Sequence, residues 1–166
     1  MSAMPQLIAA LEQEGVEVWV EGGASKDQVV ALERALSVSL PPSYVTFLTS
    51  YGAIGVGDSF VSGIIDGDAL SQAGSSAYGD TLRFRARGAF PLGYLVIGKH
   101  EDGGYCLDTT CQSAEGECPV VNFEFGSTQH RVPVAPSFGD WLVQFQLCGS
   151  NGASSPNTSL ERTRGK

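Results

Sequence analysis

The segment from Ser25 to Gly52 constrains the fold most, because it specifies two helices that cannot be continuous. Ser25 followed three residues later by Gln28 is typical of a capping box, which marks a helix N-terminus. Leu40 and Pro41 each precede a proline, and this disfavours the α conformation at both positions. The next residue, Pro42, suits the first position of a new helix. The sequence therefore predicts a helical hairpin with a forced break.

Both predicted helices have one apolar side. Val29, Leu32 and Leu36 recur at helical spacing in the first, with Glu33 on the polar side. The apolar stripe of the second helix, which Gly52 is expected to end, consists of Tyr44, Phe47, Leu48 and Tyr51. This pattern predicts a pair of helices that builds core and carries no chemistry.

The remaining chain predicts an α+β domain. Helices are expected at residues 5–13 and 137–148, and strands at 16–21, 59–66, 94–99, 105–108, 119–125 and 131–134. Glycines predict a loop before residue 58, and residues 68–87 a broken helix and loop. This order favours an antiparallel or mixed twisted sheet with helices packed on one side. Residues 1–148 form one predicted domain, and the Gly/Ser/Asn/Pro-rich residues 149–166 a disordered tail.

Three local details can be predicted within this frame. Gly63 is expected to mark a bulge or a close backbone approach. The run from Asp102 to Gly104 is expected to supply positive φ values for a hairpin turn. The alternating Arg83, Arg85 and Arg87 are interpreted as a solvated face paired with nearby carboxylates.

The charge of the chain is strongly negative. The net charge is −8, and the first 150 residues contain 17 of the 18 acidic and 7 of the 10 basic residues. Such a protein is a poor partner for nucleic acid, whose phosphates it would repel. A basic protein is a suitable partner, although net negative charge is equally explained as a solubility device. With no membrane-length apolar run and no visible signal peptide, the chain is expected to be cytoplasmic with reduced cysteines.

No active site can be recognised. Cys106, Cys111 and Cys118 beside His100 leave a metal site open as an alternative, but their spacing lacks a C-x2-C pair. His100 and the other histidine, His130, are interpreted as exposed turn residues. We expect no catalysis and no cofactor, and the sequence does not indicate the oligomeric state.

An ordered set of short matches resembles the SUKH superfamily, which includes bacterial immunity proteins and a fungal regulator of cell-wall synthesis. The matching residues are Val29, Leu32-Glu33, Leu36, Leu40-Pro41, Tyr44, Phe47-Leu48 and Tyr51-Gly52, then Ile97-Gly98, Gly103-Gly104, Leu107-Asp108, Pro119 to Val121, Ser137-Phe138 and Trp141-Leu142. The resemblance departs at Gly52-Ala53 and in the small-residue-rich residues 71–80. It implies an α+β domain without catalysis that binds partner proteins, for many members a toxin, often a nuclease.

The expected binding residues are acidic and lie in predicted turns, where recognition loops concentrate. They are Asp58, Asp66, Asp68, Glu101 and Asp102. Tyr78 or Tyr105 could supply a buried aromatic anchor. The function implied is that of an immunity protein covering a basic toxin, and the alternative is a regulatory scaffold for an endogenous protein.

Overall fold

The computed structural model describes residues 4–127 and 133–147, so the predicted tail, His130 and Cys148 lie outside the described residues. The elements, in chain order, are α1 (Met4–Gln13), β1 (Val18–Val20), α2 (Lys26–Leu36), α3 (Pro42–Ser50), β2 (Ile54–Val56), β3 (Ser59–Val61), α4 (Ala77–Ala86), β4 (Tyr94–His100), β5 (Gly103–Asp108), β6 (Val120–Glu124), β7 (Pro133–Ala135), α5 (Phe138–Trp141) and the π-helical segment η1 (Leu142–Leu147).

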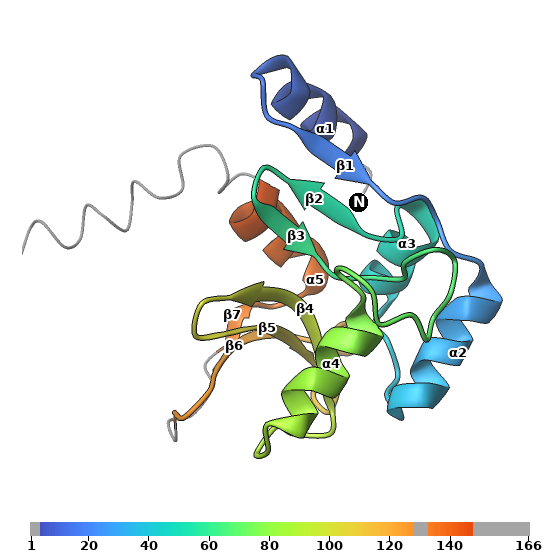
Figure 1. The fold of residues 1–166 in the computed structure, drawn as a ribbon, viewed down its shortest axis with the longest axis vertical. Coiled ribbons are helices and arrows are strands. Elements are labelled where there is room, and N and C mark those ends of the chain that lie inside the picture. Colours follow the sequence, from blue (N-terminus) through green and yellow to red (C-terminus); the bar gives the residue numbers. More distant parts are fainter. Residues whose placement is uncertain (1–3, 128–132, 148–166) are drawn as a thin grey trace, which may run out of the picture.

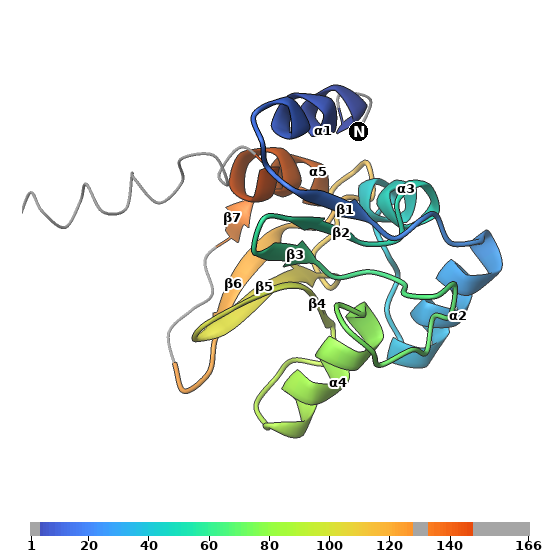
Figure 2. The same ribbon diagram turned by 45° about the horizontal axis from the view of Figure 1, so that its top comes forward.

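The described strands form two antiparallel sheets, one with the order β1-β2-β3 and one with the order β4-β5-β6-β7. Their inner edges meet just beyond β3, where the backbone N–H of Ser62 donates to the carbonyl of Ile97 at 2.8 Å. Figures 1 and 2 show the three-stranded sheet beside the β4–β5 hairpin. The α+β class with antiparallel pairing is confirmed, with the strands divided between two sheets.

Helices cover both faces of the four-stranded sheet, so the expectation of helices on one side is wrong. On one face Leu95, Ile97 and Leu107 join a core shared with α2, α3 and α5. On the other, Val96 and Cys106 pack with Phe84 of α4 in a second, aromatic-rich cluster. The physical reason is that β4 begins with the run Tyr94 to Gly98, which lacks charged residues and is buried throughout, so both faces of this part of the strand must be covered.

The helical pair forms as predicted, with long-range caps that the local pattern does not reveal. The Ser25 hydroxyl accepts from the Gln28 N–H at 3.2 Å, but the Gln28 side chain accepts from Ala69 instead of completing the box. Glu33 is half-buried and accepts from the Leu40 N–H at 2.8 Å, which holds the break between the helices. At the start of α3, the carboxylate of Glu117 accepts from the N–H and the hydroxyl of Ser43. Carboxylates are favoured at this end of a helix.

Three predictions of local structure fail for tertiary reasons. The expected loop before residue 58 contains β2, because β1 and β3 pair with it on either side. Of the broken helix and loop expected at residues 68–87, residues 68–76 are non-helical as expected, but residues 77–86 form the continuous α4. Gly79 within it is required because an added Cβ would lie 2.7 Å from Gln72 Cα. Gly103 has no positive φ; an added Cβ there would lie 2.0 Å from the carbonyl oxygen of Phe123. Close packing, not turn geometry, explains this glycine.

The structure also shows the contacts of the three arginines of α4 and its C-terminus, and of Gly63, for which the sequence made predictions. Arg83 pairs with Asp80 as expected, whereas Arg85 donates to the carbonyls of Leu36 and Leu92, and Arg87 lies over the Phe125 ring. Gly63 is a close approach, since an added Cβ would lie 1.7 Å from the carbonyl oxygen of Gly52. Within the described ranges, no helix has the length and apolar character needed to cross a membrane.

Candidate functional site

The three-stranded sheet carries two exposed aromatic side chains on one surface. Its register places Trp19 opposite Gly55 and Gly55 opposite Phe60, so these three residues form one row across the strands. Trp19 is 43% and Phe60 48% exposed, unusual values for side chains of this size. The Phe60 ring lies against Gly55, where an added Cβ would come within 2.7 Å of it. The three-stranded sheet therefore exposes an apolar surface, although most of its other apolar side chains are buried.

Strand alternation explains why carboxylates accompany the aromatic rings. Val18 belongs to the core, so Glu17, Trp19 and Glu21 face the opposite way. We call the surface made by Glu17, Trp19, Glu21, Gly55 and Phe60 the outer face. An aromatic centre with an acidic rim is suited to a basic binding partner.

Phe60 takes part in lining three hollows, two of them together with Trp19 on the outer face and one at the side of β3 that faces β4. The smallest, of about 160 Å³, is bounded by Trp19 and Glu17. The largest, of about 400 Å³, lies between Trp19, Ile65 and Ala73, with Glu21 at its side. The third, of about 360 Å³, is lined by Asp58, Ser62 and Lys99 among others. The surface is thus contoured enough to receive side chains of a partner.

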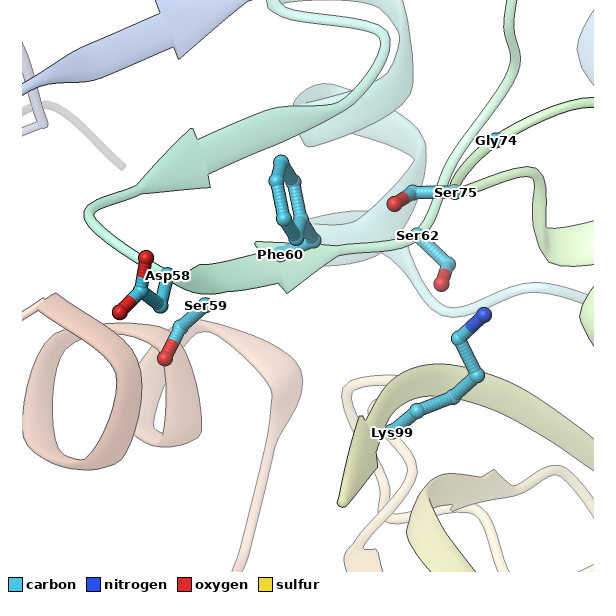
Figure 3. Close-up of a pocket in the computed structure, with 7 residues that line it drawn as sticks. All are labelled: Asp58, Ser59, Phe60, Ser62, Gly74, Ser75 and Lys99. Carbon is cyan, nitrogen blue, oxygen red and sulfur yellow. The ribbon is translucent and has the colours of Figure 1, made fainter. Parts of the chain in front are cut away.

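An ionic cluster around the buried carboxylate of Asp80 lies beside the third hollow. Figure 3 shows Lys99 extending from β4 towards Ser62, while Phe60 points away from it. The Lys99 ammonium lies 3.0 Å from the carboxylate of Asp80, which is buried and also accepts from Ser62 at 2.6 Å. Asp80 also pairs with Arg83 at 2.7 Å, so one carboxylate faces two cations and the third hollow is less acidic than the rim around Trp19.

The Tyr44 hydroxyl anchors the same region from the core. It donates to the carbonyl of Ser62 at 2.8 Å. Burial, with a further contribution from the charge of Asp80, raises the pKa of Tyr44 far above its ordinary value. Tyr44 therefore acts only as a hydrogen-bond donor, and its role is to position the end of β3.

The five acidic residues predicted from sequence do not form one group. Asp58 lines a hollow beside Phe60, at the β2–β3 turn. Asp66 lies beside the outer face, because its N–H donates to the Glu21 carboxylate at 2.7 Å, and Asp68 follows in the same turn. Glu101 and Asp102 lie at the tip of the β4–β5 hairpin and line none of the three hollows. Three of the five thus lie near the outer face.

The aromatic residues proposed as anchors are largely used inside the protein. Tyr78 packs against the main core, and Tyr105 contacts the rings of His100 and Trp141. Burial and the charge of Glu124 raise the pKa of Tyr105. Sequence reasoning missed Trp19 and Phe60, although the alternation of residues 16–21 places Trp19 with two glutamates on the polar side of its strand.

Cys106, Cys111, Cys118 and His100 do not form one cluster. Cys106 and Cys118 are buried in different clusters, and Cys111 is exposed. Among residues 4–127 and 133–147, no three His, Cys, Asp or Glu side chains are placed to hold one metal ion. His100 ends β4, half-buried and 2.7 Å from the Asn122 amide oxygen, so its interpretation as an exposed turn residue is wrong.

The family follows from comparison with known proteins. A SUKH_5 family model, described as SMI1-KNR4 cell-wall, matches residues 4–147. The chain belongs to the SUKH family. The match covers the described SUKH domain from α1 to η1, including β1 and β3 that carry the outer face. Where the sequence departs from the usual pattern, at Gly52, the SUKH fold still ends α3 with a glycine of φ +76°.

Proposed function

We propose that this protein is a non-catalytic binding protein that neutralises a basic toxin, of the nuclease type, by covering it. The observation that carries this proposal is the outer face, where Trp19 and Phe60 are exposed between carboxylates. A few buried anchor residues, often aromatic, supply most of the free energy of binding at protein interfaces. Family membership is consistent with this function.

Electrostatics supports a basic partner. The net charge of −8 attracts a cationic protein over a distance and accelerates its encounter. Nucleases that grip phosphates need cationic surfaces, and a protein that occupies such a surface excludes the nucleic acid. Inhibition therefore requires a complementary surface and no chemistry from the SUKH protein.

The test requires a candidate toxin domain, for which the product of a neighbouring gene is the first choice. Co-expression is expected to restore growth of cells that produce the toxin domain, and the purified protein to inhibit it at an equimolar ratio. In a direct comparison of acidic groups, Glu17→Lys with Asp58→Lys removes inhibition, while Glu101→Lys with Asp102→Lys carries the same charge change at the hairpin and retains it. Loss only in the hairpin variant would locate binding there and refute the role of the outer face.

A second candidate function is a regulatory scaffold for an endogenous protein, which the cell-wall description of the family favours. Such a scaffold would use the same outer face. Affinity capture from the native cell, followed by identification of the captured protein, separates the two functions. A housekeeping protein that binds through Trp19, with no toxin gene nearby, would favour the scaffold.

A further inference from the structure

Among the described residues, no strand pairs with the outer backbone edge of β1. The Gly57 N–H donates to the Glu17 carbonyl, and the Glu21 N–H donates to the Ala53 carbonyl, both at 2.9 Å. Because hydrogen-bonded positions alternate along an antiparallel strand, Trp19 also turns its backbone groups towards β2. Val18 and Val20 must turn theirs outward. In the part of the chain that the structure describes, no hydrogen bond reaches those outward groups.

Helix α1 does not cover this edge. Its apolar residues Leu7, Ile8 and Leu11 pack into the same core as the Val18 side chain, so α1 lies over the inner face of the sheet. Figure 2 shows α1 above β1, on the side that also carries α5. The Val20 side chain, near the end of the strand, remains 40% exposed. An open edge of this kind is a template for pairing with another strand.

Charge makes a second copy of this chain an unfavourable occupant. If two β1 strands paired antiparallel about Trp19, Glu17 of each copy would lie directly opposite Glu21 of the other. Like charges opposite one another destabilise a strand pair. No Lys or Arg precedes Lys26 to offset them. The edge is therefore disfavoured for self-pairing and suited to a cationic strand.

We propose that the β1 edge accepts an extended segment of the basic partner as a fourth strand of this sheet. This inference rests on the proposed function and specifies how the partner is held. Opposite Glu17, Trp19 and Glu21 the added strand carries a basic, an apolar and a basic residue, each separated by one residue. The pattern is symmetric, so it is the same whichever direction the added strand runs.

Backbone and side chains contribute different parts of this recognition. The N–H and C=O groups of Val18 and Val20 give main-chain hydrogen bonds, which bind without regard to sequence. Trp19 packs on the central apolar residue, and the two glutamates select the flanking cations. Specificity therefore resides on the outer face, and the edge fixes the register.

Val20→Pro tests the edge directly. Proline removes an N–H that points away from β2 and is tolerated in edge strands, whereas the control Val20→Ala keeps that N–H. The probe is a short capped peptide with the centre Lys-Thr-Val-Thr-Lys, titrated into labelled protein and followed by NMR. We expect the amide signals of Val18 and Val20 to shift and binding to weaken about tenfold in Val20→Pro but not in Val20→Ala. Thermal unfolding of both variants verifies that they are folded.

Two results would overturn the edge proposal. One is a peptide that shifts signals elsewhere while Val18 and Val20 stay unchanged. The other is equal binding to the folded Val20→Pro and Val20→Ala proteins. Neither depends on the toxin, so a chain that inhibits the toxin yet fails here keeps the proposed function and loses only this binding mode. A peptide with Glu in place of both Lys residues should not bind, and equal binding by it would contradict the charge pattern.

Discussion

The hydroxyl of Ser62 donates a 2.6 Å hydrogen bond to the buried carboxylate of Asp80, which ties the end of β3 to α4. Arg83 and Lys99 lie 2.7 and 3.0 Å from the same carboxylate. Both cations are about half exposed, so they can be solvated without their partner, whereas Asp80 cannot.

This difference in exposure predicts that the buried carboxylate depends on its two cations for the stability of the fold. Replacing both cations, as Arg83→Met with Lys99→Met, leaves a buried charge unpaired and should lower the free energy of unfolding by about 3–5 kcal/mol. Adding Asp80→Asn to this double variant should restore part of the loss. Chemical denaturation measures all three proteins. A double variant as stable as the wild type would show that the carboxylate is not isolated from water.

Gly63 gives a second prediction. Gly63→Ala would force a Cβ to within 1.7 Å of a carbonyl oxygen, so the backbone must move and stability should fall by about 3 kcal/mol or more. Gly57→Ala is the control: it meets no atom within 4 Å, and its positive φ of +60° should cost about 1 kcal/mol. Thermal unfolding compares the two. Equal losses would mean that close approach does not explain Gly63.

The third prediction concerns Glu33, which accepts a hydrogen bond at the break between α2 and α3. Glu33→Ala leaves the N–H of the buried Leu40 without its acceptor and should cost about 1–3 kcal/mol. Glu33→Gln keeps an acceptor oxygen and should cost less. Urea denaturation of both variants gives the comparison, and a Gln variant as unstable as the Ala variant would argue that charge, not the hydrogen bond, holds the helical break.

The fourth concerns alkaline pH. Burial raises the pKa of the Cys118 thiol from 9.0 to about 11. Between these values the unfolded chain has lost a proton that the folded chain retains, so the free energy of unfolding falls as pH rises. Below pH 9 this contribution to stability is present in full. Cys118→Ala should flatten the decline between pH 9 and 11 in equilibrium unfolding. An unchanged slope would assign the alkaline loss to other groups.

The sequence predicts the elements whose signals are local. The prolines between α2 and α3, the Ser25 cap and the alternation of β1 all determine structure within a few residues. It mispredicts β2 and α4, because their glycines read as loop signals. Gly55 lies beneath the Phe60 ring and Gly79 beside Gln72, and both contacts are made with a neighbouring segment and not within the glycine's own strand or helix.

The candidate site is harder to predict from sequence for a related reason. Hydrophobicity alone places a Trp or Phe in the core. Only the alternation of side chains along the strand shows that Trp19 lies on the same side as Glu17. For Phe60 the predicted strand of residues 59–66 shows no clear alternation of polar and apolar residues, and only Ser59–Val61 of it pairs with β2, which sets the side of Phe60. The acidic turn residues stay predictions, with Asp58 the one that lines a hollow beside Phe60.

The central claim is that the outer face binds a basic partner through its two aromatic rings. Isothermal titration calorimetry with the cognate toxin domain should show about a 30-fold rise in Kd for Trp19→Ala and for Phe60→Ala, as expected for hot-spot residues. Leu92→Ala, a side chain 71% exposed that lines none of the three hollows, is the matched control and should leave Kd unchanged. Folded Trp19→Ala and Phe60→Ala proteins that bind the toxin as tightly as the wild type would contradict the account.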